Sequence, residues 1–218
     1  MKKAIALLLA LVMVFALCAC GSSSGDSDTP AASTVSLNVG TGGESGTYYA
    51  FGGVLASFVS GKSDCKVTAL TSGGSQANVE DLTNGNVQLA FVQSDVMNYA
   101  YNGQRLFDSP VTGFSVVAQL YQEQVQIVTT NPDIKTVADL AGKKVSIGAA
   151  GSGVYFNAID VLSAYDLKES DISAVYQSFG DSAESLKDGK IDAAFIVAGA
   201  PTTAITDLAT AGSVYLVS

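Results

Sequence analysis

Short runs of β-branched and other apolar residues alternate with longer stretches of helical periodicity from residue 35 onward. Such runs predict strands where Gly, Asn, Asp or Ser residues bound them. The expected strands are Val35–Val39, Lys66–Leu70, Val87–Val92, Ser115–Leu120, Gln124–Thr129, Lys144–Ile147, Ala174–Gln177, Ala193–Val197 and Val214–Val217. The expected helices are Tyr48–Val59, Ser75–Asn84, Asp95–Tyr101, Thr136–Ala141, Val154–Tyr165, Asp181–Asp188 and Thr202–Ala211. This alternation predicts an α/β fold with parallel-rich sheets flanked by helices.

Several of the expected helices carry recognisable signals at their ends. Asn84 and Gly85 predict where the second helix ends. Asp181 or Ser182 is the expected N-cap of the sixth helix, and Asp95 is a candidate N-cap of the third.

The N-terminal residues form a separate pattern. Lys2 and Lys3 precede an uncharged apolar run that is too short to favour a membrane-spanning helix. The following Leu17-Cys18-Ala19-Cys20-Gly21 resembles a bacterial lipobox. That resemblance implies a signal peptide over residues 1–19 and a lipidated Cys20 that anchors an extracytoplasmic protein to the cell membrane. The alternative is an uncleaved anchor or a short buried helix. Residues 20–34 hold this cysteine and a Ser-, Gly- and Asp-rich run that predicts a flexible tether.

Composition narrows the possible partners. Hydrophobic residues make up 48% of the chain and charged residues 14%, which is enough to build a sizeable core. The formal net charge is −9, and an acidic protein is poorly suited to bind nucleic acid or anionic membrane surfaces. With Cys18 and Cys20 assigned to the leader and the lipid, Cys65 has no disulfide partner and is interpreted as a small core or surface residue.

The chain contains no histidine, which excludes Ser-His and Cys-His catalytic pairs and His-ligated metal sites. Gly61-Lys62-Ser63 matches the end of a phosphate-binding loop, but it follows an expected helix rather than a strand. Gly40–Gly46 is a weak match to a dinucleotide fingerprint, because Thr71–Ser75 supplies hydroxyls where an acidic residue would be needed. The sequence therefore predicts a protein that is not an enzyme and has no cofactor or metal. A secreted enzyme that uses carboxylate or Lys chemistry is the less favoured alternative.

Two glycine-rich loops each follow an expected strand and precede an expected helix, at Gly40–Gly46 and Gly148–Gly153. Ligands of open α/β sheets bind at this end of the strands. Glycine allows close approach to the backbone, and a helix N-terminus presents free N–H groups to an anion. The pattern therefore favours capture of an anionic or zwitterionic solute, helped by the hydroxyls of Thr41, Ser72, Ser75, Ser94 and Ser152.

Other residues near expected strand ends are weaker candidates. Gln93 and Ser94 end one strand, and Ala198–Pro201 follows another, but ordinary turn formation explains both about equally well. Tyr48 and Tyr49 open a helix, where aromatic residues are more often part of the core. Arg105, the only arginine, is interpreted as a solvated surface charge.

Taken together and in order, these motifs resemble the TAXI family of solute-binding proteins, which serve TRAP transporters. The resemblance spans Val35 to Ser218 and rests on Thr41–Gly43, Gly46–Tyr49, Thr71–Asn78, Gly85–Asp95, Asp139–Gly148, Gly151–Gly153, Gly189–Phe195 and Gly199–Pro201. It implies a two-lobed type II periplasmic-binding-protein-like fold with a ligand cleft between the lobes. It also implies an ion-gradient-driven TRAP-type permease as membrane partner, and glutamate- or glutamine-like amino acids or small carboxylates as ligands. The ligand contacts that it implies are Thr41, Gly42, Gly43, Tyr48, Ser72, Gln93, Ser94, Gly151, Ser152, Gly153 and Pro201.

The same resemblance suggests boundaries. Lobe 1 is expected over residues 35–121, and residues 122–218 are expected to hold the hinge, lobe 2 and the start of the return to lobe 1. Members of the family continue beyond this point, so a C-terminally truncated protein is also an expectation. A lipoprotein that senses a ligand and signals to a membrane receptor is the alternative function.

Overall fold

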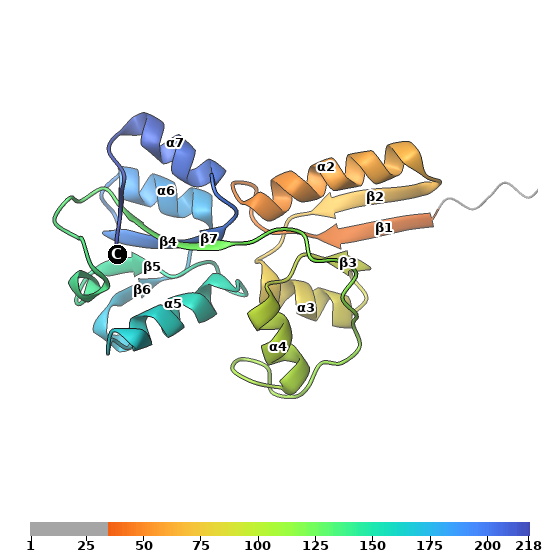
Figure 1. Ribbon diagram of the computed structural model, residues 1–218, viewed down its shortest axis with the longest axis horizontal. Coiled ribbons are helices and arrows are strands. Elements are labelled where there is room, and N and C mark those ends of the chain that lie inside the picture. The colour runs from red at the N-terminus through yellow and green to blue at the C-terminus, as the bar shows by residue number, and fades with distance from the viewer. Residues whose placement is uncertain (1–34) are drawn as a thin grey trace, which may run out of the picture. The chain divides into compact units, whose positions relative to one another are not determined.

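The computed structural model describes residues 35–218, which belong to one compact unit. The predicted signal peptide over residues 1–19, lipidation of Cys20 and the tether over residues 20–34 lie outside the described residues. Every helix among residues 35–218 is too short or too polar to cross a bilayer. Two sheets with flanking helices make up this part of the chain (Figure 1).

The first sheet is wholly parallel and has the strand order β2-β1-β3. Its elements are β1 (Val35–Gly40), α2 (Thr47–Lys62), β2 (Cys65–Leu70), α3 (Ser75–Thr83), β3 (Leu89–Ala90) and α4 (Ser94–Asn102). Helix α2 packs against β2 on one face, and α3 and α4 lie on the other face (Figure 1). Burial of β1 increases toward its carboxyl end, so that end lies deepest in the molecule.

The second sheet has the order β6-β5-β7-β4-β8. Its elements are β4 (Gln124–Thr129), η1 (Val137–Leu140), β5 (Lys144–Ser146), α5 (Val154–Ala164), η2 (Glu169–Asp171), β6 (Ser173–Val175), α6 (Phe179–Lys187), β7 (Ala193–Ala198), α7 (Thr203–Ala211) and β8 (Tyr215–Leu216). Strands β5, β6 and β7 are parallel, whereas β4 runs antiparallel to β7 and to β8. The first residue of β4 is therefore paired with the last residue of β7.

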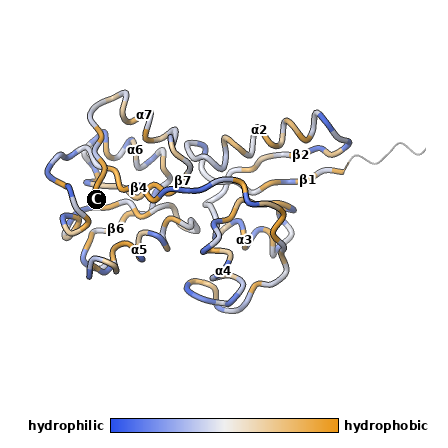
Figure 2. The backbone as a smooth tube through the Cα atoms, in the orientation of Figure 1, coloured by the Kyte–Doolittle hydropathy of each residue, from blue (hydrophilic) through white to orange (hydrophobic). Residues whose placement is uncertain are grey.

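Strand β7 forms the centre of the larger core, and all six of its residues are buried. Side chains of a strand alternate between the two faces of a sheet. Ala193, Phe195 and Val197 accordingly join a cluster with α5, while Ala194 and Ile196 join a cluster with α6 and α7. The hydropathy colouring in Figure 2 shows the corresponding apolar band along β7 and β4. A strand buried on both faces explains the uninterrupted apolar run in the sequence.

A third apolar cluster connects the helices of the two sheets. Phe156 of α5 is 1% exposed and packs with Val79 of α3 and with Val96 and Ala100 of α4. The ring of Tyr99 lies 5.5 Å from that of Phe156. Burial of a phenylalanine side chain contributes about 1.5–3 kcal/mol, so this cluster is a substantial contact between α5 and the helices α3 and α4.

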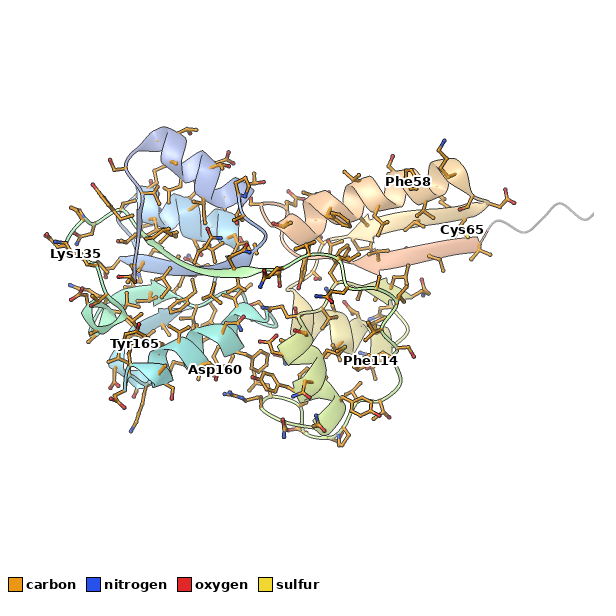
Figure 3. All side chains as sticks on the ribbon, viewed as in Figure 1. Phe58, Cys65, Phe114, Lys135, Asp160 and Tyr165 are labelled. Carbon is orange, nitrogen blue, oxygen red and sulfur yellow. The ribbon has the colours of Figure 1, made fainter. Side chains whose placement is uncertain are left out.

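The predicted strand over Ser115–Leu120 is wrong, because this stretch has no strand pairing in the structure. Val117 is 82% exposed, and Val116 and Leu120 are also exposed. The residues have strand propensity, but a strand also needs a neighbour for its N–H and C=O groups. Val54 and Phe58 on α2 are exposed as well, and Figure 3 labels Phe58 on the outer side of that helix.

Smaller departures concern the ends of elements. The strand predicted over Val87–Val92 has only two paired residues, and the helix predicted over Thr136–Ala141 is the 3₁₀ helix η1. Ser178, not Asp181 or Ser182, caps α6, and its Oγ accepts a hydrogen bond from the Asp181 N–H. Asn84 ends α3 as predicted.

Candidate functional site

Five helices begin at the rim of one pocket. The first residues or N-caps of α2, α3, α4, α5 and α6 all line it. This arrangement follows from the topology, because each of these helices follows the carboxyl end of a parallel strand in one of the two sheets, and ligands of α/β sheets bind at this end of the strands. The pocket holds a cavity of about 70 Å³. At about 10–15 Å³ for each water, this is space for a handful of waters or a small solute.

Backbone N–H groups are the main polar feature of the pocket. The first turn of a helix has N–H groups with no partner inside the helix. Helices α2, α3, α4 and α5 have N-caps at Gly46, Gly74, Gln93 and Gly153 that make no side-chain capping hydrogen bond. The first residues of α2, α3 and α5 line the cavity, so these three helices direct the positive ends of their dipoles toward it, which favours an anionic group there. The first turn of α4 lies outside the pocket lining, and its Val96 N–H already donates to Asp95.

Glycines allow the two loop regions of the pocket to approach closely. A Cβ at Gly73 would lie 2.6 Å from the carbonyl oxygen of Ala150, and a Cβ at Gly153 would overlap the Gln93 side chain. The Ala77 N–H on α3 donates to the carbonyl of Gly151 at 3.0 Å. Loop 71–74 and loop 148–153 are thus held together by backbone contacts that larger residues would prevent.

Hydroxyl groups in the pocket differ in whether they already have partners. Ser72 Oγ donates to the Thr41 carbonyl at 3.0 Å, and Ser75 Oγ accepts from the Gln93 N–H at 3.0 Å. Ser152 Oγ is buried, and no hydrogen-bond partner for it is found among residues 35–218. A buried polar atom without a partner is costly, and in a binding pocket a bound solute is one way to satisfy it.

Glu123 is the only charged side chain among the described residues that line the pocket. Its Oε2 accepts a hydrogen bond from the Tyr48 hydroxyl at 3.1 Å. Burial raises the pKa of Glu123 to about 7, the Tyr48 hydrogen bond opposes that rise, and the charge of Asp95 adds to it. Burial and Glu123 also raise the pKa values of Tyr48 and Tyr121, so both phenols are neutral at physiological pH.

Aromatic and aliphatic side chains complete the wall. The Tyr48 ring lies 5.3 Å from Phe91 and 6.4 Å from Tyr121. Tyr48 itself, Phe179 from α6 and Val197 from β7 line the pocket, and Phe91 and Tyr121 pack behind Tyr48 outside the lining. A mainly apolar wall with a few placed polar groups is typical of small-molecule sites.

Seven of the eleven predicted contact residues line the pocket: Gly42, Gly43, Tyr48, Ser72, Gln93, Ser152 and Gly153. The other four do not. Thr41 is fully buried and its hydroxyl donates to the Leu70 carbonyl, whereas Ser94 and Pro201 are exposed. Gly151 contributes its carbonyl to the Ala77 contact instead. Contact of any of these residues with a ligand stays a prediction.

Several lining residues were not predicted from the sequence, including Thr47, Glu123, Ser178 and Phe179, whereas Ser75, a candidate for its hydroxyl, does line the pocket. Glu123 is the most consequential of them. It immediately precedes β4, and because β4 runs antiparallel to β7, Glu123 enters the edge where β7 ends. Knowing that β4 is antiparallel to β7 would have placed Glu123 at the pocket. The apolar pattern of β4 does not reveal the direction of the strand, so the sequence did not predict this position.

Polar contacts connect α4 and α5 beside the pocket. Asn157 on α5 accepts from Gln93 Nε2 at 2.7 Å and donates to Asp95 at 2.8 Å. Arg105 forms an ion pair with Asp160 of α5 at 2.5 Å and lies over the Tyr99 ring; Figure 3 labels Asp160. Arg105 is therefore an exposed residue outside the pocket, as expected, and in addition it is paired with Asp160. Asp95 is not the N-cap of α4, which is Gln93.

The pocket is suited to binding a small solute. It combines helix N-termini, neutral hydroxyls, a phenol and one carboxyl group with apolar walls. Among residues 35–218, no group of three or more His, Cys, Asp or Glu side chains is arranged to hold a metal ion. Cys65 is a half-buried free thiol at the start of β2 and does not line the pocket.

Comparison with protein families finds one matching family model, described as the NMT1-like family, over residues 39–218. Solved structures match as well. The alkanesulfonate-binding protein SsuA from Xanthomonas axonopodis pv. citri, bound to MOPS, is 20% identical with a TM-score of 0.57, and the match covers 84% of this chain and 60% of that chain. An ancestral arginine-binding protein bound to arginine is 19% identical with a TM-score of 0.57, covering 84% and 78%.

A putative L-cystine ABC transporter from Listeria monocytogenes is 19% identical with a TM-score of 0.57, covering 84% of this chain and 77% of that chain. These neighbours show that the fold is that of a type II periplasmic binding protein, as the sequence predicted. The chain spans about 60% of the length of the sulfonate-binding proteins that it matches.

Proposed function

This chain belongs to the NMT1-like family, and we propose on that basis that it is an extracytoplasmic binding protein for a small polar solute. The observation that carries the proposal is the pocket at which five helices begin, with the unpartnered Ser152 hydroxyl inside it. Such a pocket supplies donors for an anionic group without a basic side chain. The named structural neighbours are proteins of binding and transport, which supports binding over catalysis.

The class of solute follows from the same groups. Two of the neighbours are bound to MOPS, a sulfonate buffer, and to arginine, and the third is a putative transporter of L-cystine. All three solutes carry a small anionic group. Amino acids and small carboxylates share this feature and are the solutes that we propose for this pocket. The contacts proposed for the solute are those predicted residues that line the cavity.

We propose two further points that rest on the sequence. The solute is delivered to a TRAP-type permease driven by an ion gradient, as the TAXI resemblance implies, and Cys20 carries a lipid that holds the protein at the membrane. Residues 35–121 and 122–218 act as two lobes that close over the solute, with the hinge in the segment that precedes β4.

Thermal unfolding of the purified chain against a panel of amino acids, carboxylates and sulfonates tests the binding function. A solute that binds only the folded state stabilises it by about 2.7 kcal/mol at a hundredfold excess over its dissociation constant. We expect one class of solute to raise the midpoint, and Ser152→Ala to reduce that rise. Ser185→Ala, a buried serine that does not line this pocket, is the control and should leave the rise unchanged. A cooperative transition that no solute shifts would contradict the proposal.

A further inference from the structure

Glu123 occupies an unusual position in the pocket. It stands just before β4, and Gln124 pairs with Ala198 at the carboxyl end of β7. The side chain therefore enters the pocket from the segment that joins the two sheets, whereas the helix N-termini enter from the strand ends. A solute in a cavity of about 70 Å³ that reaches the helix ends also lies near this carboxyl group.

The carboxylate has no positive partner in the described structure. No Lys or Arg lines the pocket, and none of the ion pairs among residues 35–218 includes Glu123. The groups that face it are the Tyr48 phenol from α2, Asp95 from α4 and Tyr121 from its own segment. Two of these groups are neutral and the third is acidic. A half-buried carboxylate in such surroundings is costly unless a cation joins it.

We propose that Glu123 is a subsite for a protonated amine of the solute, so the pocket selects a zwitterion that carries both an ammonium group and an anionic group. The anionic end lies at the N-termini of α2, α3 and α5, and the ammonium group lies at Glu123 and the Tyr48 hydroxyl. This inference rests on the proposed function and narrows it: amine-free carboxylates and sulfonates are poor ligands, because they place a negative charge beside Glu123 without compensation.

Matched pairs of solutes test the inference on the purified chain at pH 8. The pairs are L-alanine with propionate, L-glutamine with 4-carbamoylbutanoate, and taurine with ethanesulfonate. In each pair the two members differ only in the amine. We expect the amine-bearing member of at least one pair to bind ten times or more tighter in a calorimetric titration. Equal or tighter binding by the amine-free members would overturn the inference while leaving a solute-binding function in place. Failure of every member to bind would contradict both.

The variant Glu123→Gln keeps the size of the side chain and removes its charge. We expect it to lose at least tenfold in affinity for the amine-bearing solute and to lose nothing, or gain, for the amine-free counterpart. Glu44→Gln is the control, because Glu44 is exposed beside Gly43 and does not line the pocket. An unchanged ratio of affinities in Glu123→Gln would contradict the assignment, and thermal unfolding of the variant shows whether it is folded.

Acidification provides a second readout. The pKa of Glu123 is about 7, so the ionised fraction falls about thirtyfold between pH 8 and pH 5.5. If only the carboxylate binds the amine, the affinity of wild-type protein falls by about the same factor, whereas that of Glu123→Gln stays nearly constant. A wild-type affinity that is independent of pH over this interval would contradict the proposed subsite.

Discussion

Ser152 is a buried residue whose hydroxyl oxygen has no partner within the described part of the chain. A group of this kind reduces the stability of the unliganded protein, because it has lost its water without gaining a hydrogen bond. The same hydroxyl favours binding when a solute supplies the missing hydrogen-bond partner.

The variant Ser152→Ala therefore separates stability from binding. We expect the free energy of unfolding of the unliganded variant to be unchanged or higher by about 1 kcal/mol, and its affinity for the solute to fall by about fivefold to tenfold. Urea unfolding and calorimetric titration measure the two quantities. A loss of stability without a loss of affinity would show that the hydroxyl is structural.

Glu123 makes the stability of the unliganded protein depend on pH. Its pKa rises from 4.5 to about 7 in the folded state, so the folded state binds the proton more tightly than the unfolded state. The destabilisation is complete above pH 7 and disappears below about pH 4.5. A shift of this size corresponds to at most about 3 kcal/mol. We expect Glu123→Gln to be more stable than wild type by about 1–3 kcal/mol at pH 8 and similarly stable at pH 4.5. If the variant and the wild type are equally stable at both pH values, the raised pKa of Glu123 is contradicted.

Individual pocket residues were predicted from the sequence when they directly follow an expected strand. Gly42, Gly43, Ser72, Ser152 and Gly153 were found in this way, and all line the pocket. Glu123, which precedes a strand, was not predicted, because a residue before a strand lies at the pocket only if that strand is antiparallel to its neighbours. The role of Thr41 was not predictable either, because burial decides that its hydroxyl satisfies a backbone carbonyl.

The turn between β5 and α5 is the most constrained element of the site. Gly148 has a φ of +90°, and a Cβ there would lie 2.5 Å from Ser152 Oγ and 2.6 Å from Val154 Cβ. Gly189 also has a positive φ, +65°, but a Cβ there would have no neighbour within 4 Å.

Alanine substitution at these two glycines separates strain from crowding. We expect Gly189→Ala to lower the free energy of unfolding by about 1 kcal/mol from backbone strain alone. Gly148→Ala should lower it by about 2–4 kcal/mol, because crowding adds to the strain, and should also weaken solute binding. Chemical unfolding of the two variants checks this. Similar losses at both positions would contradict the close packing of the turn.

The segment that follows α4 contacts α5 through an ion pair that is partly open to water. The side chains of Arg105 and Asp160 are 39% and 43% exposed, so the pair contributes less than about 1 kcal/mol to stability. We expect Arg105→Gln to lower the affinity for the solute by about twofold to fivefold, because this pair joins segments that close over the pocket in the proposed mechanism. Lys187→Gln, which breaks a pair inside α6, should leave the affinity unchanged. An equal effect of both variants would argue against a role in closure.

Helices and strands with a clear apolar period were predicted from the sequence. A strand whose existence depends on pairing with another strand was not predicted correctly. The double-sided burial of β7 and the helical period of α5 are visible in the sequence because both elements pack on the core. Ser115–Leu120 has the composition of a strand, but nothing in the local sequence indicates whether another strand lies beside it.

For the whole molecule, the alternation of strands and helices predicted the α/β class, and the structural neighbours show the type II binding-protein fold. The chain spans about 60% of the sulfonate-binding proteins in this comparison. Within residues 35–218, both sheets nevertheless contribute to one pocket with helix N-termini, hydroxyls and a carboxyl group.

A crystal structure of the chain saturated with the solute that most raises its thermal midpoint would show whether the solute binds in this pocket. We expect the solute in the cavity, with its anionic group within about 3.2 Å of the N–H groups that begin α3 and α5 and within hydrogen-bond distance of Ser152 Oγ. A solute found at another surface, with the cavity holding only water, would contradict the account.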